Sequence, residues 1–141
     1  DRWQELDAEL SARMPSEAVR AASRTLGSGL RRLVRVTVPD ADLAALGERP
    51  HHALMLGAAC ALTGGTPQVA ARAAALATCT APASAAIRLL GLDPYAVHGM
   101  IAGLATEIDA IDFGGLPADS APALDLLADV HATQEVRLFA S

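Results

Sequence analysis

Apolar residues that recur at every third or fourth position are the feature of this sequence that most constrains its fold. Residues 16–35 show the pattern most clearly, with one apolar face made of Val19, Ala22, Leu26, Leu30 and Leu33. This spacing is typical of the buried side of a helix. β-Branched residues are dense only in residues 34–38, a run too short to build a sheet. The sequence therefore predicts an all-α fold, a single-domain helical bundle.

Prolines, glycines and capping residues divide the chain into predicted helices. Pro15 ends a first helix, and Ser16 caps the second. Pro82 is expected to break or kink a later helix that begins near Gln68. Ser120 is expected to cap the last one. The predicted helices span residues 2–13, 16–35, 40–47, 50–62, 68–79, 84–90 and 93–112, followed by one after residue 120.

The composition limits how the core can be built. The chain has 141 residues, of which 52% are hydrophobic and only 3% aromatic. Small aliphatic side chains bury little apolar area each, so such a core depends on many close contacts. Residues 53–71 carry no charge, but a turn at residues 63–68 argues against a membrane span. Cys60 and Cys79 lack CxxC spacing, so we expect buried free thiols and a cytoplasmic location.

Charge excludes several classes of function. The sequence contains no lysine, which rules out a phosphate-binding loop of the GxxxxGK[ST] type and a Schiff-base lysine. Residues 1–35 hold seven arginines and five acidic residues, whereas residues 93–141 hold one arginine and eight acidic residues. An acidic C-terminal third argues against a nucleic-acid partner. It is compatible with a basic protein surface as partner, with weak attraction of metal ions, or with a solvated surface.

The residue types that carry chemistry do not form a recognisable set. His51 and His52 are adjacent, so on a helix they point about 100° apart and cannot easily bind one ion. They are expected to be surface or capping histidines, as are the isolated His98 and His131. No catalytic motif, tightly bound cofactor or metal site is predicted, and the chain is not expected to be an enzyme. Three acidic residues lie close together at the C-terminal end of a predicted helix: Glu107, Asp109 and Asp112. Negative charge there opposes the helix dipole, so this end is expected either to be solvated or to make an electrostatic contact.

Gly99 and Gly103 lie one turn apart on the helix predicted after Asp93. Two glycines at this spacing leave a patch without Cβ atoms, on which another helix can approach closely. Glycine costs about 1 kcal/mol relative to alanine inside a helix, so the pair indicates a packing role. The patch is expected either to pack within the chain or to contact a dimer mate or partner.

Three stretches, in matching order and spacing, resemble the urease accessory protein UreF family. They are Ser16–Leu30, similar to the family's E-x-R-x-A-S-x-x-x-G-x-x-L helix, Ser84–Leu90, similar to S-A-A-x-R-L, and Arg137–Ser141, similar to R-L-F-x-S. The chain departs from the family after Leu89, where it reads Leu90-Gly91-Leu92-Asp93-Pro94 in place of x-P-L-G-Q. The resemblance covers most of the chain and the C-terminal two-thirds of a family member, of an actinobacterial type, so the family's N-terminal helices are expected to be absent.

The resemblance implies a fold and a function. UreF proteins are all-helical, dimerise, and join UreD (also called UreH) to the GTPase UreG for nickel insertion into the urease apoenzyme. This implies a helical domain over residues 1–136 and a partner-binding tail over 137–141, in a cytoplasmic homodimer without a nucleic-acid or membrane partner. Arg137, Leu138 and Phe139 would contact UreD, and Arg88 would lie near a dimer or GTPase surface. Nickel would be handled by the complex.

A second hypothesis is the helical ligand-binding domain of a transcriptional regulator. The acidic C-terminal third and the scarcity of aromatic residues for lining a pocket are less compatible with that class.

Overall fold

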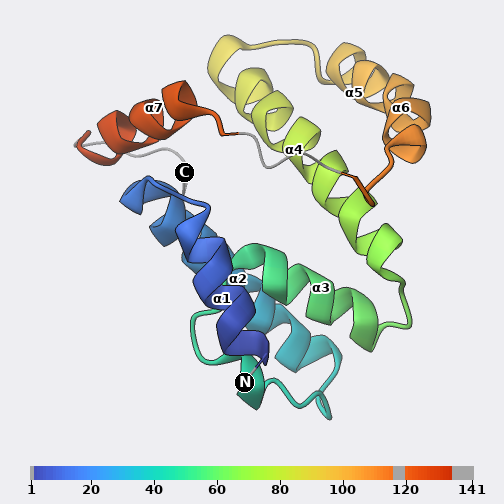
Figure 1. Ribbon diagram of the computed structural model, residues 1–141. Coiled ribbons are helices and arrows are strands. Elements are labelled where there is room, and N and C mark those ends of the chain that lie inside the picture. The colour runs from blue at the N-terminus through green and yellow to red at the C-terminus, as the bar shows by residue number, and fades with distance from the viewer. Residues whose placement is uncertain (1, 116–119, 135–141) are drawn as a thin grey trace. The chain divides into compact units, whose positions relative to one another are not determined.

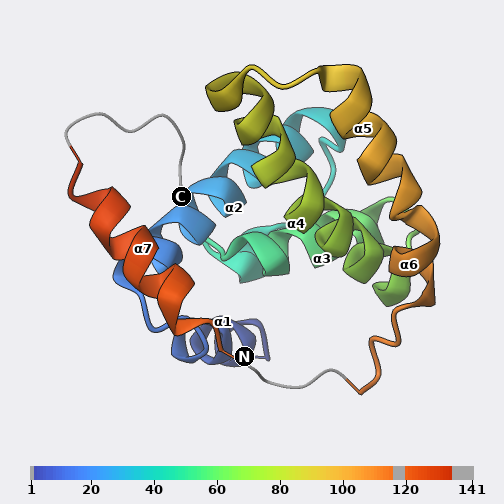
Figure 2. The same cartoon turned by 90° about the horizontal axis from the view of Figure 1, so that it is seen from above.

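The chain folds into two compact helical units in a computed structural model that describes residues 2–115 and 120–134. The first unit combines residues 1–64 with residues 118–141, and the second unit is formed by residues 65–117 between them. Within the described ranges every regular element is helical, which confirms the all-α prediction (Figures 1 and 2). The sequence predicts a single bundle, whereas the structure divides at Gly64, which has a positive φ of 79°.

The first unit is built around the longest of its helices, α2. Its core consists of Val34, Leu43, Met55 and Ala58, which come from α2, the segment before η1, and α3. Helix α3 packs against α2, and α7 also lies along α2. The elements are α1 (Arg2–Ala12), α2 (Glu17–Thr37), the 3-10 turn η1 (Ala44–Leu46), α3 (His52–Leu62) and α7 (Pro122–Ala132).

Helix α2 begins where the sequence predicts, but it packs through a different face. The Ser16 hydroxyl accepts a hydrogen bond from the backbone N–H of Val19, as expected of an N-cap. The predicted apolar face is correct only in part: Leu30 packs against the core, whereas Leu26 and Leu33 remain 48% and 56% exposed. The buried residues of α2 are Gly27, Arg31 and Val34.

Gly27 explains this change of face. A Cβ atom added to Gly27 would overlap the carbonyl oxygen of Pro50 and lie 3.0 Å from the backbone nitrogen of His52. Real Cβ atoms do not approach backbone this closely, so the start of α3 can reach α2 only where α2 has no side chain. Close backbone packing at Gly27 therefore decides which side of α2 faces inward.

The second unit contains α4 (Pro67–Leu90), α5 (Pro94–Gly103) and α6 (Ala105–Ala110). The Asp93 carboxylate accepts hydrogen bonds from the Tyr95 and Ala96 backbone N–H groups, which confirms the predicted helix start. The predicted helix over 93–112 is instead divided at Leu104. Helices α5 and α6 both contact α4, and Ile108 is the buried hydrophobic residue of α6.

Helix α4 differs from the prediction at Pro82. The helix is continuous from Pro67 to Leu90, so the expected break after Cys79 is wrong. Proline removes one backbone hydrogen bond, and the alanine-rich sequence on both sides propagates the helix through that gap. Gly91 ends the helix in the left-handed conformation, with a φ of 64°.

Helix α4 is also the one helix of the described residues that is long and apolar enough to cross a membrane, judged by length and composition. None of that window is buried. As the sequence predicts, a turn between α3 and α4 interrupts the uncharged residues 53–71. Core helices of water-soluble proteins can have the same composition, so α4 alone does not indicate a membrane protein.

Two smaller predictions about helix ends also change. The helix predicted over residues 40–47 is reduced to the single 3-10 turn η1, which Gly47 ends with a φ of 69°. Ser120 does not cap α7, because the helix begins at Pro122 and its N-cap residue is Ala121. A proline at the first position starts α7 without a side-chain cap.

Candidate functional site

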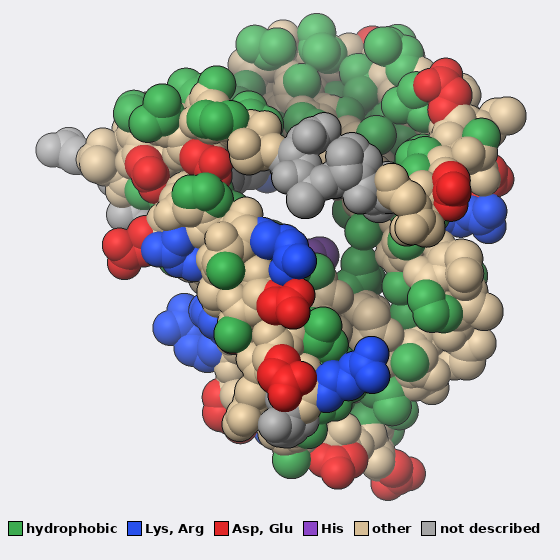
Figure 3. All heavy atoms as spheres, in the orientation of Figure 1, with side chains coloured by type: hydrophobic (Ala, Val, Ile, Leu, Met, Phe, Trp, Pro, Cys, Tyr) green, Lys and Arg blue, Asp and Glu red, His purple; other side chains and the backbone are tan. Residues whose placement is uncertain are grey.

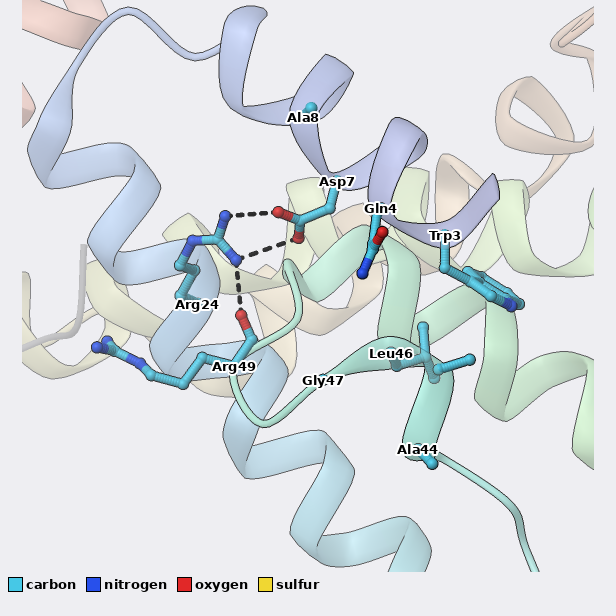
Figure 4. Close-up of a pocket in the computed structure, with 10 residues that line it drawn as sticks. Trp3, Gln4, Asp7, Ala8, Arg24, Ala44, Leu46, Gly47 and Arg49 are labelled. Atoms are coloured by element: carbon cyan, nitrogen blue, oxygen red, sulfur yellow. Dashed lines mark hydrogen bonds and ion pairs between the residues drawn. The ribbon is translucent and has the colours of Figure 1, made fainter. Parts of the chain in front are cut away.

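A polar network joins α1, α2 and the start of α3 (Figure 4). The Arg24 guanidinium of α2 donates to both carboxylate oxygens of Asp7 on α1, at 3.1 and 2.7 Å. The same guanidinium donates to the backbone carbonyl oxygen of Arg49 at 2.7 Å and to the Ser11 hydroxyl at 3.2 Å. Arg24 therefore holds α1 and the segment before α3 against α2.

His51 lies at the centre of this network and is completely buried. Its Nε2 atom is 2.9 Å from the Ser11 hydroxyl oxygen on α1, and its Nδ1 atom is 3.0 Å from the Ser23 hydroxyl oxygen on α2. The Ser23 hydroxyl also accepts a hydrogen bond from the His52 backbone N–H at the start of α3. Of the two expectations for His51, the surface position is wrong, because Gly27 allows this backbone to lie against α2. His51 does occupy the N-cap position of α3, although its side chain makes no capping hydrogen bond.

The charge around His51 favours its neutral form. Burial lowers the pKa of His51 below its usual value, and the nearby positive charges of Arg24 and Arg20 act in the same direction. The Asp7 carboxylate opposes them. The hydrogen bonds from Arg24 hold the pKa of Asp7 below its usual value. At neutral pH the network thus contains an ionised Asp7–Arg24 pair beside a neutral imidazole.

The geometry does not support catalysis by this network. A hydroxyl within hydrogen-bond distance of an imidazole can form a nucleophile and base pair. Here, however, the imidazole is inaccessible to solvent, and both of its nitrogens are occupied by serine hydroxyls rather than by a carboxylate. Across residues 2–115 and 120–134, no group of three His, Cys, Asp or Glu side chains could hold a metal ion. The network therefore acts as a clasp between helices.

Two further arginines, Arg20 of the motif and Arg31 just beyond it, lie on the same face of α2 as Gly27. The Arg20 guanidinium donates to the backbone carbonyl oxygens of Met14 and, at 2.7 Å, of Pro15. The guanidinium of Arg31, whose side chain is 6% exposed, pairs with the Glu48 carboxylate at 3.1 Å. The arginines on this face of α2 thus bind the loops that lie beside it. Their role in the structure is to hold those loops in place.

Two pockets border the same region. One, of about 400 Å³, lies between α1, α2 and η1, and the residues around it include Trp3, Gln4, Asp7 and Arg24 (Figure 4). The other, of about 310 Å³, is more apolar and includes Trp3, Leu43, Leu46 and Leu62. Trp3 contributes to both pockets, so α1 forms part of the wall of each.

The structure brings together few of the residues that the sequence marks as candidates. Arg88 lies on an exposed position of α4 and is engaged in an interaction of its own. A Cβ atom added to Gly99 or Gly103 would meet nothing within 4 Å, so neither glycine packs closely against the described chain. The contact role of this patch for another chain stays a prediction. The tail residues Arg137, Leu138 and Phe139, and the boundary at 136, lie outside the described residues.

Two further predictions concern thiols and acidic residues. Cys60 and Cys79 are free and half-buried, one in each unit, which confirms free thiols and corrects their full burial. Among the crowded acidic residues of α6, Asp109 forms an ion pair with Arg72 of α4 at 3.3 Å. That carboxylate thus makes an electrostatic contact inside the second unit.

Comparison with known proteins decides the family. The sequence model of the UreF family matches residues 1–105. The chain belongs to the UreF family. It is 46% identical over 138 residues to the urease accessory protein UreF of Mycobacterium marinum, and 41% identical to that of Mycobacterium tuberculosis, and in both cases 96% of the chain is covered. The resemblance predicted from three short motifs is thereby confirmed.

The match covers only part of these relatives. The chain spans about 65% of the length of the UreF protein of M. marinum. It spans the same share of the UreF protein of Mycobacterium sp. strain JLS, and its identity to that second relative is 44%. No solved structure matches the chain.

Sequence reasoning missed the residues of the clasp. Asp7 and Ser11 carry no local signal, because their partners lie between 13 and 40 positions away in the sequence. Ser23 is the serine of the A-S pair in the motif of residues 16–30, but the motif does not identify its partner. One signal was available: Arg20, Arg24 and Arg31 share a narrow arc of α2 that also contains Gly27. Several arginines beside a glycine on one helix face indicate guanidinium groups that become buried and therefore need hydrogen-bond acceptors from other segments.

Proposed function

We propose that this chain is a urease maturation scaffold that joins UreD (UreH) and the GTPase UreG for nickel insertion into the urease apoenzyme. The observation that carries the proposal is its membership in the UreF family, whose curated members named above are urease accessory proteins. The chain would act in the cytoplasm as a homodimer within the complex. It would bind no nucleic acid, membrane or tightly held cofactor.

A scaffold without enzymatic activity is compatible with the site described above. The name of the relatives is that of an accessory protein. The serine–histidine arrangement at His51 is closed to solvent and fastens helices together. Nickel would be bound by the partners or by the assembled complex, and this chain would hold those partners in place.

Helix α7 has the properties of a partner-binding element. Its half-buried positions include Asp125, Ala128 and Ala132, which lie on one side of the helix. On that side the Asp129 carboxylate accepts hydrogen bonds from the Ser16 hydroxyl, at 2.5 Å, and from the Ala18 backbone N–H. The opposite side is apolar and at least 60% exposed, and it contains Leu126, Leu127 and Val130 (Figure 3).

This orientation reverses the usual arrangement of a surface helix, in which the apolar side faces the core. An exposed row of large apolar side chains marks a surface that another protein covers. The tail residues Arg137, Leu138 and Phe139 follow α7 directly in the sequence. We assign α7 and the tail together to the contact with UreD.

The second unit supplies the other proposed contacts. Arg88 on α4 would lie near the GTPase or the dimer mate. Gly99 and Gly103 on α5 leave a patch that is open to the backbone of a second chain. The exposed apolar surface of α4 is compatible with burial in an assembly.

Co-purification from cells that also produce UreD and UreG tests the proposal. The full chain should retain both partners, whereas a chain that ends before Arg137 should lose UreD. Replacing Leu126 and Leu127 together by glutamate should weaken UreD binding at least tenfold. Leu33→Glu is the matched control, because Leu33 is a 56% exposed leucine of α2, outside α7.

Two results would contradict the assignment. If the shortened chain binds UreD as tightly as the full chain, the tail is not the contact. If neither UreD nor UreG is retained by the full chain, the scaffold function itself is wrong. A thermal shift with small apolar ligands, without partner binding, would instead support the regulator hypothesis, which no observation on the structure favours.

A further inference from the structure

Polar groups attach helix α1 to α2 and to the segment before α3. No residue of Arg2–Ala12 is buried. Asp7 and Ser11 connect the helix to Arg24 and His51, and all four side chains meet in the clasp described above. Trp3 and Leu6 of α1 are 36% and 37% exposed, so apolar contact also contributes to docking. Since no residue of α1 is fully buried, the polar contacts form a substantial part of its attachment, which therefore depends on the charges in the clasp.

Protonation of His51 would disturb this balance of charge. The charged groups that act on His51 are Asp7 from α1 and Arg20 and Arg24 from α2. The loop before α3 contributes the Arg49 carbonyl oxygen, which is already bound to Arg24. An imidazolium would add a third positive charge to a buried site that holds one carboxylate. Hydration of that charge requires water to enter between α1 and α2.

We propose that His51 is a proton-sensitive latch, and that its protonation releases α1 from α2 and α3. The docked state binds the neutral imidazole, with one ring nitrogen donating and the other accepting. The released state exposes the imidazole to water, where it takes up a proton more readily. By linkage, if the released state binds the His51 proton tenfold more tightly than the docked state, protonation changes the ratio of released to docked molecules up to tenfold.

The sign of the effect follows from the shift at His51. Because the docked state holds the pKa of His51 below its ordinary value of 6.5, docking is favoured fully above that pH. It weakens as the pH falls below 6.5 toward the lower value of the docked state. The Asp7 carboxylate remains ionised through this range, since its own pKa is lowered from 3.8. Of these two groups, His51 rather than Asp7 therefore takes up a proton in this range.

Fluorescence of the 141-residue chain tests the latch, because its single tryptophan, Trp3, lies on α1. Lowering the pH from about 7.5 to about 5.5 should shift Trp3 emission to the red and increase its quenching by acrylamide. Far-UV circular dichroism and the amide protection of α3 should remain unchanged. Ser11→Ala removes the bond from α1 to His51 and should move the transition to higher pH.

His51→Gln keeps a polar side chain that does not titrate, so its Trp3 emission should be constant over this range. His52→Gln is the matched control and should behave as the unmodified chain. An unchanged transition in His51→Gln overturns the proposal. If His51→Gln does not fold, amide exchange of the unmodified chain decides: equal protection of α1 at both pH values, after correction for intrinsic rates, also overturns it.

Discussion

At the scale of single residues, Gly27 has the largest effect on the arrangement of the first unit. Two helices approach each other there until backbone meets backbone. The clasp at His51 depends on this approach, because Ser23 on α2 reaches both the His51 ring and the His52 N–H only when the segments are this close. A side chain at Gly27 would thus disturb both the packing and the polar network.

We predict that Gly27→Ala destabilises the first unit by up to about 2 kcal/mol. Overpacking costs about 1–3 kcal/mol, and here the obstructing atoms belong to the backbone of Pro50, which cannot rotate away. The gain in helix propensity, about 1 kcal/mol, offsets only part of this cost. Urea unfolding followed by Trp3 fluorescence measures the change.

Gly29→Ala is the matched control on the same helix. A Cβ atom at Gly29 would meet nothing within 4 Å. The substitution should therefore stabilise α2 by about 0.5–1 kcal/mol through helix propensity alone. Equal effects of the two substitutions would show that close packing at Gly27 does not limit stability.

The sequence could locate the arginines of α2 on one face, but it could not identify their partners. Arg24 binds Asp7 and the Arg49 carbonyl, which lie 17 positions before it and 25 positions after it. Local periodicity instead predicts that the face with Leu26 and Leu33 is buried. Periodicity counts apolar side chains, so it cannot detect a face that is buried because a glycine has no side chain. Close packing at Gly27 therefore determines the buried side of α2, although Leu26 and Leu33 lie on another side.

At the scale of elements, helix starts with capping side chains were the most predictable features. Ser16 and Asp93 each accept hydrogen bonds from the first turn, as their sequence context indicates. Interior features were less predictable. Pro82 does not interrupt α4, and Leu104 divides a helix that its apolar pattern predicts to be continuous. A cap acts within three residues, whereas a break depends on tertiary packing.

We predict that Pro82→Ala stabilises α4 by about 1–3 kcal/mol. The substitution restores a backbone N–H within the helix and removes the clash of the proline ring with the preceding turn. Thermal unfolding followed by circular dichroism should show a higher midpoint.

Pro94→Ala is the control for this element-scale prediction. Pro94 occupies the first turn of α5, where proline needs no hydrogen-bond acceptor and is favourable. It should give no gain in stability. A gain of similar size in both variants would mean that proline affects the unfolded chain more than the helix.

At the scale of the whole molecule, the two units bury very different amounts of apolar surface. The first unit contains the core cluster of Val34, Leu43, Met55 and Ala58. The second unit buries one large hydrophobic side chain among its described residues, Ile108. The separation into units was not predictable from composition, which is rich in alanine on both sides of Gly64.

We predict that the second unit unfolds at a lower urea concentration than the first. Cys60 lies in the first unit and Cys79 in the second, and both thiols are free and half-buried. Pulsed labelling with a thiol reagent should modify Cys79 before Cys60, and Cys60 should become reactive together with the change in Trp3 fluorescence. A single shared midpoint for both thiols would instead indicate one cooperative unit.

The hydrogen bond between Ser16 and Asp129 joins residues 113 positions apart. During synthesis on the ribosome, the cap of α2 emerges early, and its carboxylate partner emerges only after the whole second unit. The first helices must therefore persist without α7 while about a hundred residues are added, at roughly 5–20 residues per second. For those seconds the nascent chain presents an uncovered side of α2, and a partner or chaperone that binds there competes with the chain's own last helix.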